Sequence, residues 1–324
     1  MSKPCISDLH ITPSWCSYAG SMHGILQSAG WWKEEFWKFY GLSGIAWHFI
    51  VHETCCPSSI TVYHWTNEHY YAMDRLGIFT SSDEMFFSPS LNTFKHLQKV
   101  CETKIKNCID KGKGVLIWAP SPCLEFGIIK GYDDTQGIFI TEAINDKHPD
   151  PLLYENLGLG EVPILYCQYP LSQVNIPLEK AIASSLRYGL SEWKKDSHIH
   201  PQYACGKKAY DLWIQAMDHP KLNGFGLAYL LAVYHEARQT LHHFLEWLNV
   251  ESNEFPGVEE AVLLYQQVTD YFEQMCQIWP FMPKEQEREA PKQELRQELK
   301  NLLQKAKERE TVAMKAIEKA LHLH

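Results

Sequence analysis

The stretch Glu125-Phe-Gly-Ile-Ile-Lys-Gly-Tyr-Asp-Asp134 decides the fold class of the first half of the chain. It is one strand length of mostly apolar residues that ends in an aspartate-rich turn, a pattern typical of a buried strand and a hairpin. Further strands are predicted over residues 114–119, 137–141 and 162–168. Because helical spacing dominates before residue 112, helices precede antiparallel strands, and this order predicts an α+β domain.

The helices of this domain are marked by apolar residues at spacings of three and four. They are predicted over residues 16–29, 33–40, 65–76 and 91–109, each ending close to a glycine. Residues 45–52 show a two-residue period instead, so a further strand is expected there. We therefore expect residues 1–172 to pack helices on an antiparallel sheet.

The second half of the chain carries helical signals only. Helices are predicted over residues 175–194, 207–217, 226–248 and 257–277, followed by a charged amphipathic helix at the C-terminus. Residues 173–324 are therefore expected to form an all-α helical bundle. The apolar stripe of the last helix can dock on its own bundle, which is the preferred interpretation, or on a second copy, which would make the protein a homo-oligomer.

The bulk composition narrows the class of protein. The chain has 324 residues, of which 45% are hydrophobic and 21% charged, as in soluble globular proteins. Its net charge of -9 argues against a nucleic-acid partner, because phosphate binding needs clustered Lys and Arg. The first residues lack a secretory signal, no apolar run is long enough for a membrane span, and the ten cysteines are dispersed, so free thiols in the cytoplasm are expected.

Three segments carry a resemblance to a known family: Pro13-Ser-Trp-Cys16, Gly41-Leu-Ser-Gly-Ile-Ala-Trp-His-Phe49 and Gly131-Tyr-Asp133. They resemble the papain-like superfamily, and within it most closely the butirosin biosynthesis protein H N-terminal type and the peptidases that trim bacteriocin leaders. The resemblance implies a thiol nucleophile at the start of the first long helix. It also implies a histidine at the head of a strand, and an Asp or Asn on the next strand that orients this histidine.

Carried onto this chain, the resemblance gives an altered catalytic dyad. It makes Cys16 the nucleophile and His10 a donor to the oxyanion, in the place where the family often has a glutamine. The family histidine falls at Glu125, and its orienting partner falls near Glu142 or Asn145. A carboxylate cannot become the cation that stabilises a thiolate, and beside a cysteine it disfavours the charged form. A protonated Glu125 would instead be a general acid.

Two functions therefore remain open. The first is a thiol hydrolase or an acyl or peptidyl transferase that acts on a small-molecule, peptide or acyl-thioester substrate. The second is a non-catalytic protein that binds a small molecule or peptide in the cleft expected between the Cys16 helix and the strand bearing Glu125, with Glu125 recognising an amine or another donor. Each residue also has a plain structural interpretation, since a free cysteine such as Cys16 is commonly a small buried hydrophobe and Glu125 can be an ion-paired strand end.

Aromatic residues are the candidates for substrate contacts. The residues expected to line the cleft are Trp15, Trp47, His48, Trp118 and Tyr132. A second group contains possible metal ligands, namely His48, His52, Glu53, Cys55 and Cys56. Their order does not match a paired-cysteine finger or a paired-histidine helix motif, so neither a metal nor a cofactor is predicted.

Overall fold

The computed structural model describes residues 4–86, 90–144, 146, 149–195, 200–251, 255–282 and 288–323. The chain forms two compact units, one made of Met1–Phe36 with Trp65–Asn175 and the other of Trp37–His64 with Ile176–His324. The expected division after residue 172 lies close to the end of the first unit. The segment 37–64, however, was expected in the first domain and belongs to the second unit.

The first unit is built around a six-stranded sheet in which every pair of neighbours is antiparallel. In spatial order its strands are β2 (Ile78–Phe86), β7 (Ile164–Gln173), β3 (Val115–Trp118), β4 (Phe126–Asp133), β5 (Ile138–Ala143) and β6 (Leu152–Leu153). The expected α+β class with an antiparallel sheet is confirmed. Strand β2 was not predicted, because its sequence is largely polar and reads as a loop.

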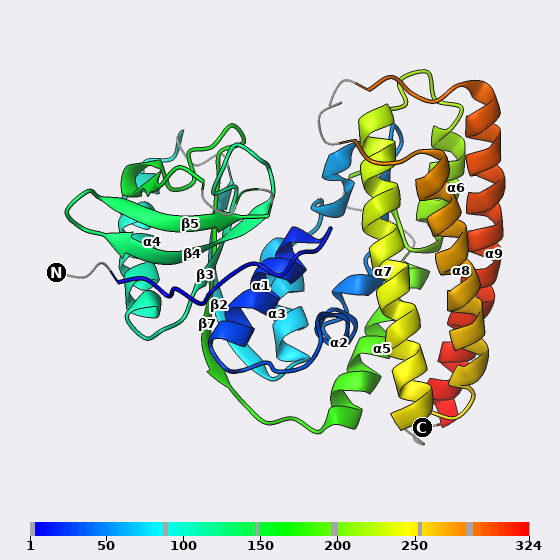
Figure 1. Cartoon of the computed structure of the whole chain (residues 1–324), viewed down its shortest axis with the longest axis horizontal. Helices are drawn as coiled ribbons and strands as arrows, with labels where there is room; N and C mark the ends of the chain where they lie inside the picture. The colour runs from blue at the N-terminus through cyan, green and yellow to red at the C-terminus, as the bar shows by residue number, and fades with distance from the viewer. Residues whose placement is uncertain are drawn as a thin grey trace. The chain divides into compact units, whose positions relative to one another are not determined.

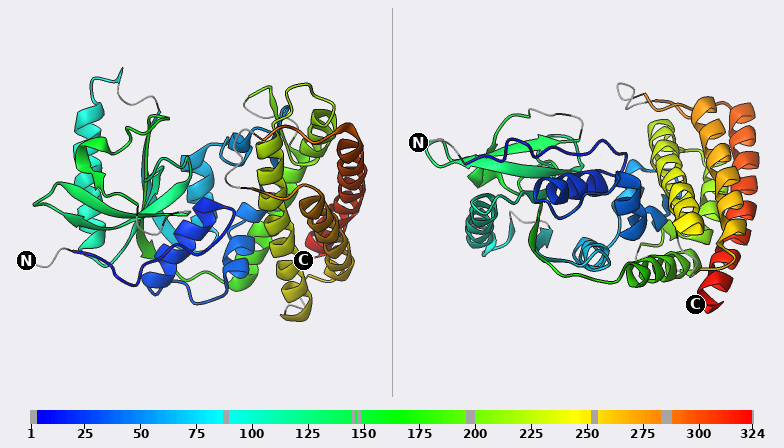
Figure 2. Two further views of the ribbon diagram at one scale, coloured as in Figure 1. Left: turned by 45° about the horizontal axis from the view of Figure 1, so that its top comes forward. Right: turned by 60° about the horizontal axis from the view of Figure 1, so that its bottom comes forward.

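Helices cover both faces of this sheet (Figure 1, Figure 2). One face carries α1 (Ser17–Ser28) and α3 (Trp65–Asp74), and the other carries α4 (Phe94–Ile109). Every residue of β4 is consequently buried, which explains why its sequence is mostly apolar rather than alternating. The stretch that decides the fold is thus a strand covered on both sides.

Gly131 has a packing reason to be in this strand. The N-terminal segment pairs antiparallel with β4 here, with Cys5 opposite Gly131 and hydrogen bonds from Tyr132 N–H to the Pro4 carbonyl at 3.0 Å and from Ile6 N–H to the Lys130 carbonyl at 2.8 Å. A Cβ on Gly131 would lie 2.7 Å from the Pro4 carbonyl oxygen, a distance that side chains do not tolerate.

The segment 37–64 begins within α2 (Phe36–Leu42) and continues through two short 3-10 helices, Ile45–Trp47 and Pro57–Ile60, separated by strand β1 (Ile50–His52). The strand expected over 45–52 is therefore wrong in its first half. Ile45, Ala46 and Trp47 are all buried, so this segment does not have the one buried and one exposed face that a two-residue period indicates.

The second unit contains α5 (Leu178–Lys194), α6 (Lys207–Ala216), α7 (Gly224–Glu251), α8 (Val258–Ile278) and α9 (Gln293–Leu323). Figures 1 and 2 show α7, α8 and α9 running side by side. The unit is not all-α, because β1 pairs with β8 (Tyr203–Cys205) in a two-stranded antiparallel sheet. Phe49 and Val51 of the 37–64 segment share a hydrophobic core with Trp213 and Leu230, which explains why this segment joins the second unit.

Helix α9 packs within its own unit, against α8, α5 and α6, so the expectation that it docks on its own bundle is confirmed. A buried ion pair joins α9 to α7, with 3.1 Å between Arg238 Nη2 and Glu310 Oε1. The hydroxyl groups of Tyr210 and Tyr265 donate to the same Glu310 carboxylate at 2.5 Å and 3.0 Å. Four helices therefore converge on one buried charge. None of the helices in the described ranges is long and apolar enough to cross a membrane.

Candidate functional site

Cys16 stands at the N-terminus of α1. Its backbone N–H donates to the Ser14 hydroxyl at 3.0 Å, and its carbonyl accepts from Gly20 N–H at 3.0 Å, so Cys16 is the capping residue of the helix. The side chain is half-buried, and no side-chain hydrogen bond caps this end. A group at this end lies in the positive potential of the helix, which favours an anion such as a thiolate.

Glu125 lies against the same end of α1. The hydroxyl of Ser17, the residue after Cys16, donates to Glu125 Oε2 at 2.5 Å and accepts from Phe126 N–H at 3.1 Å. The Glu125 carbonyl accepts from Ala119 N–H at 2.8 Å, which fixes the entry to β4. The structure therefore brings the carboxylate to the first turn of the Cys16 helix. The negative charge of a carboxylate held there offsets the positive potential of the helix end that would otherwise stabilise a thiolate.

His10 and Glu142 form a second pair. His10 Nδ1 lies 3.0 Å from Glu142 Oε2, and Glu142 also accepts from Ile11 N–H at 2.9 Å and from Lys130 Nζ at 2.7 Å. Burial alone would raise the pKa of Glu142, but the hydrogen bonds from Lys130, Ile11 and His10 outweigh it and hold this pKa below its usual value. Glu142 is 1% exposed, whereas the His10 side chain is 58% exposed. The pair is a buried anion with one partner at the surface.

The two pairs lie apart. Glu142 is the register partner of Ile128, whose backbone position is about 10 Å beyond Glu125 along β4. The backbone of His10 lies against Gly24, because a Cβ added to Gly24 would be 2.0 Å from the His10 carbonyl oxygen. Gly24 is about 12 Å from Cys16 along α1. His10 is thus engaged with the buried charge of Glu142 rather than placed as an oxyanion donor beside Cys16. The four residues expected in one catalytic site therefore form two separate pairs, Cys16 with Glu125 and His10 with Glu142.

Two other histidines of this unit have hydroxyl partners. His23 Nδ1 lies 2.7 Å from Thr12 Oγ1, and burial lowers the pKa of this imidazole. His69 is buried on α3, where Nδ1 lies 2.7 Å from the Tyr166 hydroxyl and the ring stacks on Tyr18 at 3.6 Å between centroids. Asn145, the alternative orienting residue, lies outside the described residues.

A cavity of about 520 Å³ in the first unit is large enough for a small molecule, and Leu124, the residue before Glu125, lies in its wall. Its walls are the loop between β3 and β4, which includes Leu124, and the segment 149–164. Among the described residues that line it, three are acidic and none is basic: Asp146, Asp150 and Glu161. The cavity therefore favours a ligand with positive charge.

Two details of the cavity wall are typical of binding sites. The indole N–H of Trp118 is buried and has no hydrogen-bond partner among the described residues, an arrangement that leaves one donor for a ligand or a water. Ala119 has φ of 47°, a left-handed conformation that costs a non-glycine residue about 1 kcal/mol or more. The backbone hydrogen bond between Ala119 and Glu125 ties this wall to the start of β4.

The five residues expected to line the cleft do not lie together in the structure. Trp118 lines the cavity, and Trp15, which is 37% exposed, is next to Cys16. Trp47 and His48 belong to the second unit, where Trp47 Nε1 donates to Ser185 Oγ at 3.0 Å and His48 hydrogen-bonds the hydroxyl of Tyr188. They are packing and hydrogen-bonding residues of that unit.

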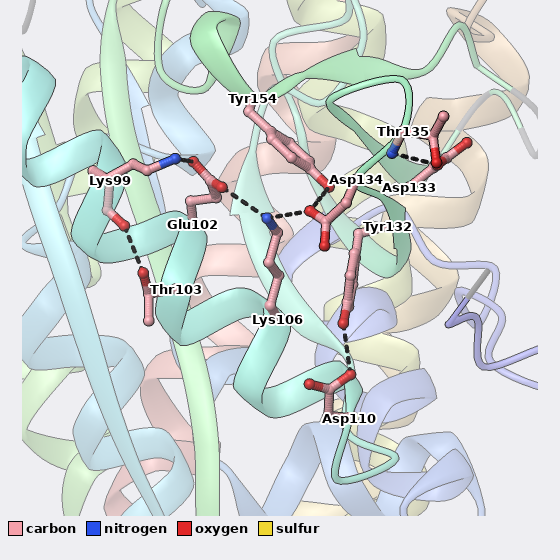
Figure 3. Close-up of polar contacts among 10 residues, drawn as sticks. All are labelled: Lys99, Glu102, Thr103, Lys106, Asp110, Tyr132, Asp133, Asp134, Thr135 and Tyr154. Atoms are coloured by element: carbon pink, nitrogen blue, oxygen red, sulfur yellow. Dashed lines mark hydrogen bonds and ion pairs between the residues drawn. The ribbon is translucent and has the colours of Figure 1, made fainter. Parts of the chain in front are cut away.

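Tyr132 points to the other face of the sheet, where α4 lies (Figure 3). Its hydroxyl donates to Asp110 Oδ1 at 2.8 Å. Beside it, Lys106 Nζ bridges Glu102 Oε1 at 2.7 Å and Asp134 Oδ1 at 2.5 Å, which fastens α4 to the hairpin after β4. Tyr132 and Asp134 therefore have a structural role away from Cys16.

Sequence reasoning missed Ser17 and Lys130. The signal for Ser17 was its position, since a hydroxyl in the first turn of a helix can reach an acid nearby. The signal for Lys130 was a lysine inside an otherwise apolar strand, because a buried lysine requires a carboxylate partner. In the part of the chain that the structure describes, no group of three or more His, Cys, Asp or Glu residues could hold a metal ion.

The comparisons with known proteins add no relative: no protein-family model and no curated protein matches the chain.

Proposed function

We propose that the first unit is a papain-like domain that binds a small molecule or peptide through a positively charged or hydrogen-bond-donating group, such as an amine, at Glu125. The observation that carries the proposal is the Ser17–Glu125 hydrogen bond, which holds a half-buried carboxylate at the first turn of the Cys16 helix. An ammonium or guanidinium group is the natural partner for such a carboxylate.

The adjoining cavity supports the same ligand class. Its three carboxylates add negative charge in the wall that contains Leu124, the residue before Glu125, and its proline and aliphatic residues supply an apolar surface. The unpartnered Trp118 N–H can donate to a carbonyl oxygen of the ligand. A cationic group next to an apolar part and an amide carbonyl describes a lysine- or arginine-containing peptide or a polyfunctional aliphatic amine.

A second candidate function rests on Cys16 itself, because its half-buried thiol stands at the N-terminus of α1. In a thiol hydrolase or an acyl or peptidyl transferase, the Cys16 sulfur would bond to the acyl carbon and release the leaving group, for example the thiol of an acyl-thioester. An amine held at Glu125 would then take the acyl group from sulfur and give up a proton to the carboxylate.

Binding of defined probes to the full chain tests the first proposal. Short peptide amides with a lysine at their N-terminus should shift amide resonances of β4 and raise the melting temperature, whereas the same peptides acetylated on both amino groups, and therefore uncharged, should not. The Glu125→Gln variant should lose at least tenfold in affinity, since a charge-assisted hydrogen bond contributes about 1.5–3 kcal/mol. Equal affinity in wild type and variant would contradict the proposal.

Alkylation separates the two functions. In wild-type protein, the binding proposal expects iodoacetamide to label Cys16 no faster than the partly exposed Cys123 near neutral pH, as measured by peptide mass spectrometry. Much faster labelling of Cys16 would favour the transferase.

A further inference from the structure

A lysine-lined groove lies in the second unit, between the end of α5, the start of α6 and the C-terminal part of α9. Its volume is about 410 Å³, within the range of small-molecule sites. The lysines on its wall are Lys194, Lys195, Lys207, Lys208 and Lys315. No residue of the groove belongs to the first unit, so it is independent of the function proposed above.

The positive charge of the groove exceeds what its own acids neutralise. Two acids line it, Asp211 and Glu318. Glu318 pairs with Lys194, and Lys195 pairs at 2.9 Å with Glu192 of α5. Asp211 pairs at 2.5 Å with Lys307, and neither Glu192 nor Lys307 is part of the groove wall. Within the described ranges, neither Lys207 nor Lys315 makes an ion pair.

This concentration of charge is unusual for a chain whose net charge is -9. Like charges gathered in a concave surface repel one another more strongly than on an open surface, because less water screens them. A bound anion removes this repulsion. The lysines therefore favour an occupant with more than one negative charge.

The remaining wall is apolar. Leu190, Trp193 and Met314 line the groove beside the lysines, and Trp193 is half-buried, so one part of its indole is available for contact. An inorganic anion would leave this surface uncovered. A ligand with an apolar or aromatic part next to its charged group would cover it.

We infer that this groove binds a small phosphorylated molecule whose phosphate contacts Lys207, Lys208 and Lys315 and whose apolar or aromatic part packs on Trp193. A phosphate carries up to two charges and several acceptor oxygens, which suits several lysine ammonium groups better than a single carboxylate does. The groove volume of about 410 Å³ fits a small molecule rather than an acidic protein surface.

Calorimetric titration of the full chain with adenosine diphosphate, adenosine monophosphate, inorganic phosphate and acetate tests the inference. The two nucleotides are expected to bind, phosphate to bind at least tenfold more weakly than adenosine diphosphate, and acetate not to bind. Phosphate affinity equal to that of the nucleotides would overturn the role of Trp193. Absence of nucleotide binding at millimolar concentration would overturn the site.

Variants locate the binding. Lys207→Gln and Lys315→Gln should each weaken adenosine diphosphate about tenfold, since each removes one charge-assisted contact. Lys319→Gln is the matched control, because Lys319 is exposed on the same helix as Lys315 but does not line the groove, and it should change the affinity less than twofold. An equal effect of all three variants would contradict a defined site. Tighter binding of a poly-glutamate peptide than of any nucleotide would replace the small molecule by an acidic polypeptide.

Discussion

The Ser17 hydroxyl donates a hydrogen bond to the Glu125 carboxylate, with 2.5 Å between Ser17 Oγ and Glu125 Oε2. This contact joins residues 108 positions apart in the sequence and fixes the start of β4 to the first turn of α1. Because Cys16 directly precedes Ser17, one hydrogen bond determines which charge stands beside the cysteine. The proposed binding function depends on that charge.

Ser17→Ala should destabilise the first unit by about 1–3 kcal/mol. The substitution removes the donor to Glu125 and leaves Phe126 N–H without the oxygen that it contacts at 3.1 Å, and a buried unpaired N–H is costly. Hydrogen–deuterium exchange of the β4 amides would measure the change. Ser191→Ala, at an exposed position of α5, is the control and should leave exchange in β4 unchanged. Unaltered protection of β4 in Ser17→Ala would contradict the prediction.

Glu142→Gln should destabilise the first unit at neutral pH by about 3 kcal/mol, because it leaves the buried Lys130 ammonium without its anion. The pKa of Glu142 is lower in the folded protein than in the unfolded chain, so the stability that it contributes is present above the unfolded pKa and is lost as the pH falls through the folded pKa.

The difference between wild type and Glu142→Gln should therefore be largest above about pH 5 and shrink below about pH 4. Exchange of β4 and β5 amides at several pH values measures it. A difference that does not depend on pH would show that the carboxylate charge has no part in the effect.

Glu310→Gln should destabilise the second unit by about 3–5 kcal/mol, because Arg238 is fully buried and would lose its counter-charge. Burial against this charged pair also holds the pKa of the Tyr210 and Tyr265 hydroxyl groups well above the usual value. The double variant Arg238→Met with Glu310→Gln should lose much less than the sum of the two single variants. Urea unfolding of the three proteins tests this, and additive losses would contradict the ion pair.

The sequence was sufficient where one physical pattern dominates. The apolar run of β4, the glycines that end α3 and α4, and the apolar stripes of α5 to α9 were found close to their true bounds, since period and termination signals are local. It failed where tertiary contacts override the pattern. Residues 45–47 form a 3-10 helix because both sides of the segment are buried, and β2 is a strand although its sequence is polar.

The candidate site was predicted in part for the same reason. Glu125 lies at the first turn of the Cys16 helix, in the region where the sequence placed it, whereas His10, which was expected as a donor to the oxyanion, contacts Glu142. His10 contacts Glu142 where Glu142 of β5 and Lys130 of β4 form a buried charged pair, and this pairing depends on the β4–β5 register rather than on sequence spacing. Ser17 and Lys130 were missed because neither belongs to a motif.

The most direct test of the account compares the alkylation of Cys16 in wild type, Glu125→Gln and Glu125→His. We expect labelling by iodoacetamide near neutral pH to be slowest in wild type, faster when the carboxylate becomes a neutral amide, and fastest when an imidazole occupies its place, while the labelling of Cys123 stays constant. The same rate at Cys16 in all three proteins would contradict the claim that Glu125 stands beside Cys16 and sets its chemistry.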